Sequence, residues 1–294
     1  MKTHNNNIII GTAQFTKNYG INNTNSHFKN KFEYLDEIFK LGCSGIDTAL
    51  NYGNAQKTIG LWLKNNNYKM KIYTKISDTQ TDLSALDNIF KKCLVELNLK
   101  KIEGLLMHNQ NDWHKKEVQS FANKILKNNL VNSFGLSIYN KSSIPVHSNI
   151  KILQIPGSIF NQEILTSKEL RSYIESGGEV HVRSVFVQGI IFMKKTNIPK
   201  YLSELVQPIK LFQHLAKEAN ADPISLAIQS VYKLCPTCKL VLGANNIVQL
   251  QELVKKSKNY IENSVIEEAL QIGSKFPHKL WDPRFWKKKN FKYY

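Results

Sequence analysis

Short apolar segments alternate with longer amphipathic segments along most of the chain. The apolar segments have the length of buried strands and run over Ile8–Ile10, Gly45–Thr48, Lys71–Lys75, Ile102–His108, Ser133–Ser137, Ile152–Ile155, Val180–Ser184 and Lys239–Gly243. The segments between them place apolar residues at helical spacing, as in Lys31–Leu41 and Leu83–Leu97. Alternation of this kind predicts parallel β/α units, and eight units predict a single (β/α)8 TIM barrel.

Helical segments also extend the pattern beyond eight simple units. Pro199–Ala219 and Pro223–Leu234 both have helical character after the seventh strand, and two more helices are expected from Ile247 onward. No Pro-, Gly- or Ser-rich linker divides the chain. We therefore expect one barrel domain over residues 1–275, with extra C-terminal helices, followed by a basic aromatic tail over residues 276–294.

The charge of the chain raises the question of an anionic partner. The 40 lysines and arginines outnumber the 23 acidic residues, for a formal net charge of +17. The lysines are spread along the chain, and only Lys287–Lys289 are interleaved with aromatic residues, beside Trp286, Phe291 and Tyr293. A solvated basic surface is therefore expected rather than a nucleic-acid site, although the tail could form a weak anionic-surface contact. We expect Trp281 and Trp286 to anchor it.

The sequence gives little support for a membrane span, a signal peptide, a redox-active cysteine pair or a metal site. No apolar run approaches the roughly 18 residues of a membrane span, and the isoleucines after Asn7 are too few for a signal peptide, so a cytoplasmic protein is expected. The pair Cys235 and Cys238 precedes a strand, whereas a thioredoxin-like motif opens a helix. No further ligands complete a zinc site, so no metal is predicted. The oligomeric state stays open.

Four chemically capable residues fall near predicted strand ends. Asp47, Lys75 and His108 end the second, third and fourth strands, and Tyr52 follows in a loop where Gly53 permits a tight turn. The carboxyl ends of parallel barrel strands form one rim, where active sites lie. There a lysine held by an aspartate could tune the phenol as a proton donor, and His108 could orient a carbonyl. Taken singly, each could also be an unrelated rim residue.

Several strings, spread over nearly the whole chain, resemble the aldo-keto reductase superfamily. They are Gly45–Ala55, Tyr73–Lys75, Leu105–Asn109, Phe134–Ser137, Leu153–Pro156, Arg183–Gly189, Val241–Ala244 and Gln249–Glu252. The resemblance implies a (β/α)8 barrel that reduces a carbonyl with NAD(P)H. It further implies that Tyr52 donates the proton, that Lys75 and Asp47 tune it, and that His108 orients the substrate.

The resemblance also implies a cofactor site. Its positions are Thr12 and Ala13 near the ribose, Ser137 and Gln154 at the carboxamide, Ser184, Phe186, Gln188 and Gly189 along the pyrophosphate, and Gly243, Ala244, Gln249 and Glu252 at the adenosine end. Asp47 is also among these positions, without assignment to one part of the nucleotide. NADPH is the expected cofactor, with NADH possible, because the cations that many members place near Gly243 and Gln249 are missing. Lys255 or Lys256 could substitute for them.

Two further positions depart from the family pattern. Ile138 follows Ser137 where many members carry an asparagine, and the ring-stacking position is occupied by Arg183 or Phe186. Such an arginine could instead contact an anionic substrate. Loose resemblance of Gly11–Phe15 and Tyr19–Ile21 to bacterial members of carbohydrate pathways suggests a sugar-derived aldehyde or ketone. The alternative function is a nucleotide-binding regulatory protein on the same barrel with little turnover.

Overall fold

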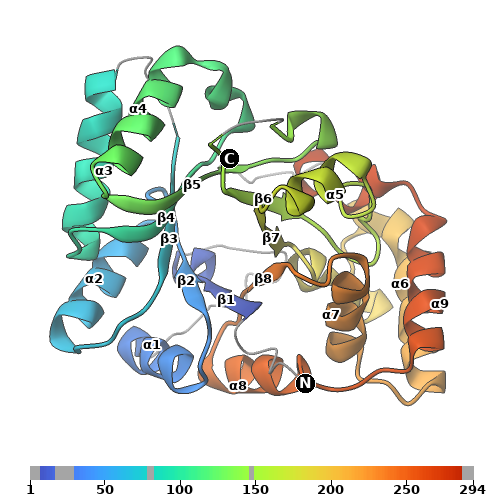
Figure 1. Ribbon diagram of the computed structural model, residues 1–294. Helices are drawn as coiled ribbons and strands as arrows, with labels where there is room; N and C mark the ends of the chain where they lie inside the picture. Colours follow the sequence, from blue (N-terminus) through green and yellow to red (C-terminus); the bar gives the residue numbers. More distant parts are fainter. Residues whose placement is uncertain (1–6, 17–29, 78–82, 146–148, 287–294) are drawn as a thin grey trace.

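The strands close into a barrel in chain order. The structure, a computed structural model, describes residues 7–16, 30–77, 83–145 and 149–286 (Figure 1). All neighbouring strands are parallel, and the last pairs with the first. The strands are β1 (Ile8–Gly11), β2 (Gly45–Asp47), β3 (Ile72–Ile76), β4 (Ile102–Met107), β5 (Val131–Ser137), β6 (Ile152–Pro156), β7 (Glu179–Arg183) and β8 (Lys239–Leu242). The predicted (β/α)8 barrel is confirmed, with strand ends shifted by one or two residues.

Helices surround the strands on the outside of the barrel (Figure 1). They are α1 (Lys31–Lys40), α2 (Ala55–Asn65), α3 (Leu83–Leu97), α4 (Lys116–Lys127), α5 (Lys168–Glu175), α6 (Val206–Glu218), α7 (Pro223–Leu234), α8 (Ile247–Lys256) and α9 (Asn263–Ser274). Side-chain caps mark several starts, such as Asp222, which accepts hydrogen bonds from two backbone amides at the start of α7. The predicted helices over Leu83–Leu97 and Pro223–Leu234 match the observed ones.

One predicted helix begins later than expected. The sequence pattern predicts a helix over Pro199–Ala219, but residues Lys200–Leu205 form a 3-10 segment and α6 begins only at Val206. Pro208 explains the difference, because proline lacks an N–H and clashes with the carbonyl four residues before it. It is tolerated in the first turn of α6, whereas a helix beginning near Pro199 would place it in the interior.

Apolar side chains fill two shells on either side of the strands. The outer shell, between strands and helices, includes outward-facing residues such as Phe134 and Leu136. The inner shell, within the barrel, contains Ile9, Tyr73, Leu106 and Ile152. Glycines make room for the large ring: a Cβ at Gly104 would lie 2.7 Å from the Tyr73 ring and one at Gly45 2.9 Å from it. The barrel interior is therefore packed rather than open.

A polar cluster, here called the lower cluster, lies at the N-terminal end of the interior. Glu179 of β7 contacts Lys239 Nζ at 2.5 Å and His181 Nε2 at 2.5 Å. Lys239 Nζ also lies 3.4 Å from the Tyr73 hydroxyl, and the His181 ring meets the Tyr73 ring edge-on at 4.8 Å. Burial opposes ionisation of Glu179, but its bonds to His181 and Lys239 lower its pKa to about 2. The sequence analysis assigned no role to these residues.

The last helices and the segment after them form a second apolar cluster. α9 packs beside α6 and α7, and both tryptophans of the following segment are buried. Trp281 stacks on Phe160 at 3.9 Å, and Trp286 Nε1 donates to the Leu280 carbonyl at 2.8 Å. The basic run Lys287–Lys289 and the string Tyr19–Ile21 lie outside the described residues. Within the described ranges, no helix combines the length and apolar character that crossing a membrane requires.

Candidate active site

Asp47 and Lys75 form a buried ion pair at the C-terminal end of the barrel, here called the upper pair. Lys75 Nζ lies 2.7 and 2.6 Å from the two Asp47 carboxylate oxygens and 3.2 Å from the Thr48 carbonyl. Both side chains are almost fully buried, at 2% and 4% exposure. Gln154 Nε2 donates to Asp47 Oδ1 at 2.8 Å. Every oxygen and proton at this pair therefore has a nearby partner, as a buried charge requires.

Tyr52 lies above the upper pair, in the loop between β2 and α2. Gly53 adopts φ +55°, as the predicted tight turn requires, and the Tyr52 N–H donates to the Ala49 carbonyl at 3.0 Å. The Tyr52 ring centroid is 5.5 Å from Lys75 Nζ. It meets the His108 ring edge-on at 6.3 Å. The structure thus brings the four predicted residues together at one rim.

The electrostatics of the site keep Tyr52 protonated. Burial raises the pKa of Tyr52 above its ordinary value, the Asp47 charge adds to that rise, and the Arg183 charge opposes it. The sequence analysis expected Lys75 to supply the opposing charge. Lys75 Nζ lies 5.5 Å from the Tyr52 ring centroid and is held there by Asp47 and Thr48, while burial lowers its own pKa against the effect of Asp47. A protonated phenol suits a group that acts as an acid.

His108 is neutral at physiological pH in this environment. Burial, followed by the charges of Lys75 and Arg183, lowers its pKa to about 4. A neutral imidazole has one N–H donor and one acceptor nitrogen, so it can donate a hydrogen bond to a carbonyl oxygen without transferring a proton. The predicted orienting role agrees with this protonation state.

Comparison with known proteins identifies the family. The sequence profile of the aldo/keto reductase family matches residues 7–272. The chain belongs to the aldo/keto reductase family. No curated protein matches it by sequence.

Solved structures of aldo-keto reductases share this fold at low sequence identity. An aldo-keto reductase from Bacillus halodurans in its holo form is 17% identical, with 91% of each chain covered and a TM-score of 0.71. A glycerol dehydrogenase from Gluconobacter oxydans is 14% identical, covering 98% of this chain and 95% of its own, with a TM-score of 0.71. An aldose reductase from Schistosoma japonicum is 16% identical over 90% and 87%, with a TM-score of 0.65.

The cofactor residues implied by the family fall into separate parts of the same rim. Ser137 and Gln154 are buried neighbours in the register of β5 and β6, and Gln154 uses one amide donor on Asp47. Ile138, at the departure from the family pattern, is fully buried. Thr12 is also fully buried, and its hydroxyl donates to the Asp47 carbonyl at 3.1 Å. Thr12, directly after β1, therefore holds the backbone of Asp47 in place, and Ala13 beside it is buried as well.

The loop after β7 has an unusual backbone. Ser184, Val187, Gln188 and Gly189 all have φ between +48° and +82°. For the β-branched Val187 this conformation is strained, and strain of this kind concentrates at functional sites. Successive backbone N–H groups in such turns can form anion-binding concavities. A Cβ placed on Gly189 would meet nothing within 4 Å, so the loop has open space beside it.

The predicted adenosine end lies at the start of α8. Gly243 is approached closely by Gln14, and an added Cβ would lie 1.7 Å from Gln14 Nε2, so a larger residue there would require the Gln14 side chain to move. Gln249 and Glu252 are exposed, and Ala244 is buried with its carbonyl accepting from the Tyr34 hydroxyl at 3.1 Å. These positions together supply no cation.

Both lysines considered as substitutes for the missing cations lie at the other end of α8. Lys255 and Lys256 occupy the last turn of α8, whereas Gln249 lies in its first turn. At 1.5 Å per residue the two ends of this helix are more than ~10 Å apart. Lys256 is moreover paired with Asp222 at 3.0 Å. The structure thus gives Lys256 another partner and places Lys255 about two turns along the helix from Gln249.

The structure places Phe186 and Arg183, the two candidates for the ring-stacking position, in different surroundings. Phe186 packs against Phe192, with ring centroids 5.2 Å apart, and against the apolar clusters. Arg183 ends β7 and lies over the ring of Tyr139 at 4.4 Å. The sequence analysis missed Tyr139, although its place two residues after the predicted Ser137 was a usable signal.

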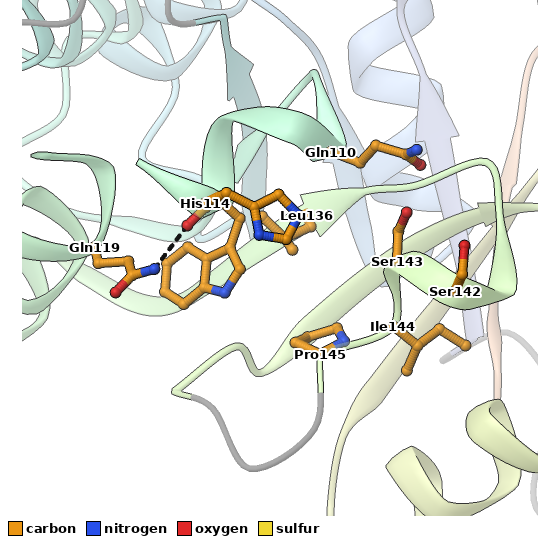
Figure 2. A pocket seen from close by; sticks show the side chains of 9 residues that line it. Gln110, His114, Gln119, Leu136, Ser142, Ser143, Ile144 and Pro145 are labelled. Atoms are coloured by element: carbon orange, nitrogen blue, oxygen red, sulfur yellow. Dashed lines mark hydrogen bonds between the residues drawn. The ribbon is translucent and has the colours of Figure 1, made fainter. Parts of the chain in front are cut away.

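A cavity of about 200 Å³ opens elsewhere, on the helix side of β5 (Figure 2). Leu136, an outward-facing residue of the outer apolar shell, lies at its base, and loop residues such as His114 and Ser143 line it. None of the four rim residues borders this cavity. It is therefore separate from the candidate active site.

Proposed function

We propose that the chain is a cytoplasmic NAD(P)H-dependent reductase that converts a small aldehyde or ketone to an alcohol, with Tyr52 as the proton donor. The observation that carries this proposal is the convergence of Tyr52 and His108 above the buried Asp47–Lys75 pair. A buried ion pair is costly unless it is well satisfied, and here it lies where barrel enzymes place their chemistry. Family membership supports the same reaction class.

Each rim residue has a distinct proposed task. Tyr52 holds a proton at its hydroxyl and donates it to the substrate oxygen. His108, kept neutral by its surroundings, donates a hydrogen bond that orients the carbonyl. Lys75 places a positive charge beneath Tyr52, which favours the phenolate left after proton donation. Asp47 holds Lys75 in position.

The rim also fits a nicotinamide dinucleotide. The left-handed loop from Ser184 to Gly189 and the open space beside Gly189 suit a phosphate-bearing group. Ser137 and Gln154 would hold the carboxamide, and Gly243 and Ala244 would lie at the adenosine end. When bound in its reduced form, the nucleotide supplies the hydride. NADPH was the expected form, and the lack of a cation among residues 243–252 makes NADH an equal candidate.

We further propose a polyhydroxylated or sugar-derived carbonyl as substrate. One structurally similar protein is described as a glycerol dehydrogenase, and another as an aldose reductase. Both names refer to polyols or sugars. The basic charge of the chain would favour acidic members of that class.

The test combines binding with turnover. Fluorescence titration with NADPH and NADH should show binding of at least one, and a panel of aldehydes should then oxidise it. Tyr52→Phe should keep nucleotide binding but lose turnover by about 10²- to 10⁴-fold, because the acid is gone. Tyr260→Phe, at an exposed tyrosine that follows the last turn of α8, is the matched control and should be silent. Binding without Tyr52-dependent turnover would indicate the regulatory alternative instead.

A further inference from the structure

Arg183 extends from the end of β7 toward the mouth of the barrel. His181, two residues earlier, faces the interior, since its ring contacts the inner-shell Tyr73 at 4.8 Å. Side chains alternate along a strand, so Arg183 shares the inward face and lies nearer the C-terminal rim. Its charge acts on three of the four rim residues: it lowers the pKa of Tyr52, Lys75 and His108 alike, within the larger effect of burial.

The charge of Arg183 has no counter-ion among the described residues. Asp47, the rim carboxylate, is already in contact with Lys75 at 2.6 Å and with Gln154 at 2.8 Å. The ion pairs between described residues include none at Arg183. Asp47, Lys75 and Arg183 together thus bring two cations and one carboxylate to this site. An uncompensated cation in a partly buried site is unfavourable unless a bound anion completes it.

The Arg183 guanidinium is held in place, but one of its N–H donor groups makes no hydrogen bond. Its carbon lies 4.4 Å from the centroid of the Tyr139 ring, and Nη1 donates weakly to Ser184 Oγ at 3.4 Å. Nη2 is buried and makes no hydrogen bond. A guanidinium lying over an aromatic ring keeps its planar fork of N–H groups available, and that fork matches a carboxylate or phosphate.

Tyr139 is itself fixed from two sides. Its backbone N–H donates to Gln110 Oε1 at 2.7 Å, and the guanidinium carbon of Arg284 lies 3.5 Å from its ring centroid. Arg284 differs from Arg183 because both Asp282 carboxylate oxygens accept its hydrogen bonds, at 2.5 to 3.0 Å. Of the two arginines on Tyr139, therefore, only Arg183 keeps an uncompensated charge among the described residues.

We propose that Arg183 binds an acidic group, a carboxylate or a phosphate, carried by the carbonyl substrate. This inference rests on the proposed reductase function, because it assigns the anion to the substrate of that site. Arg183 is then the specificity-determining residue of the rim, and Tyr139 is the positioning residue that orients it. The net positive charge of the chain would concentrate such substrates at the surface.

The experiment compares substrates that differ only in charge. The carboxylate arm uses 4-carboxybenzaldehyde and its neutral analogue methyl 4-formylbenzoate, and the phosphate arm uses glyceraldehyde 3-phosphate and glyceraldehyde. Wild-type kcat/KM should favour the anion in at least one arm. Arg183→Met should reduce that preference by about 10- to 100-fold, the usual effect of a charged hydrogen bond. Arg171→Met, at an exposed arginine of α5, should leave it unchanged.

A binding measurement separates this inference from the proposed function. Calorimetry of 4-carboxybenzaldehyde and its ester against nucleotide-free protein needs no turnover, and the Kd ratio should show the same loss in Arg183→Met. Arg183→Lys, which keeps the charge but not the fork, should lose an intermediate amount. Equal affinities for acid and ester in the wild type, together with no anion preference in the phosphate arm, would overturn the inference even if the enzyme is an active reductase. Preserved preference in Arg183→Met would also overturn it. Failure of every carbonyl to oxidise NAD(P)H would refute only the reductase function.

Discussion

The barrel interior carries a lysine–carboxylate pair at each end, and the two pairs differ in their surroundings. The upper pair, Asp47 and Lys75, is at most 4% exposed and lies beneath Tyr52 and His108. In the lower cluster, Glu179 is 36% exposed, and the Tyr73 hydroxyl lies beside Lys239 at the N-terminal end of the barrel. Residue types alone would not separate these sites. Their position along the strands does, because the loops that bind substrate follow the carboxyl ends.

Neutralising the lysine at each end tests this difference most strongly. We expect Lys75→Met to lower kcat by about 10²-fold or more, because the phenolate formed at Tyr52 would lose its supporting charge. Lys239→Met, the matched variant, should change kcat by less than about 3-fold. Steady-state assays on both purified variants measure this directly. Similar losses in the two variants would mean that the lower cluster also takes part in turnover.

Removing the carboxylate charge should affect stability unequally. Asp47→Asn leaves Lys75 buried without a counter-charge, and we expect about 3 kcal/mol lower free energy of unfolding. Glu179→Gln should cost less, about 1 kcal/mol, since this carboxylate is about a third exposed and water partly screens its charge. Urea unfolding followed by circular dichroism measures both values. If Glu179→Gln proved the more damaging, burial would be the wrong basis for ranking the pairs.

Protonation of His108 should make the free energy of unfolding depend on pH. Its pKa falls from about 6.5 unfolded to about 4 folded. The unfolded chain binds this proton first, so the contribution of His108 is fully present above pH 6.5 and is lost as the pH falls toward 4. His108→Asn should flatten this part of the profile by about 1 kcal/mol, allowing for partial exposure. His214→Asn, at an exposed histidine of α6, should leave the profile unchanged.

The smallest expected effect concerns the nucleotide. With no cation among residues 243–252, the Kd values for NADH and NADPH should differ by less than about 10-fold. Gln249→Arg adds a cation in the first turn of α8 and should tighten NADPH binding relative to NADH. Val248→Arg, on an exposed neighbour, is the control for general charge. A wild-type preference for NADPH far above this limit would show that another part of the chain binds the 2′-phosphate.

Most of the fold and of the candidate site could be predicted from hydrophobic periodicity and from the positions of residues at strand ends. They located all eight strands and brought Asp47, Lys75, His108 and Tyr52 to one rim, because strand direction alone decides which end a residue occupies. They could not show that Lys255 and Lys256 lie at the far end of α8. That placement follows from the start and direction of the helix, and Lys256 is paired there with Asp222.

Contacts between segments that are distant in the sequence could not be predicted from the pattern of hydrophobic and polar residues. The stacking of Arg183 and Arg284 on Tyr139 joins β7, the C-terminal segment and the loop after β5. The pairing of Glu179 with Lys239 likewise depends on the register of β7 against β8. Such contacts arise from packing geometry, which a single sequence does not display.

Closure of the barrel by β1 and β8 has a consequence for synthesis of the chain. β1 is made first, yet its second neighbour, β8, is nearly the last element of the barrel to be made. Until then the growing sheet has two unpaired edges, which are prone to pairing with other chains. Asp47, Lys75 and His108 are synthesised early, but β8 and the loop that follows it are synthesised much later. We therefore expect nascent chains that stop before Leu242 to aggregate, so that release of nearly the full sequence sets the yield of native protein.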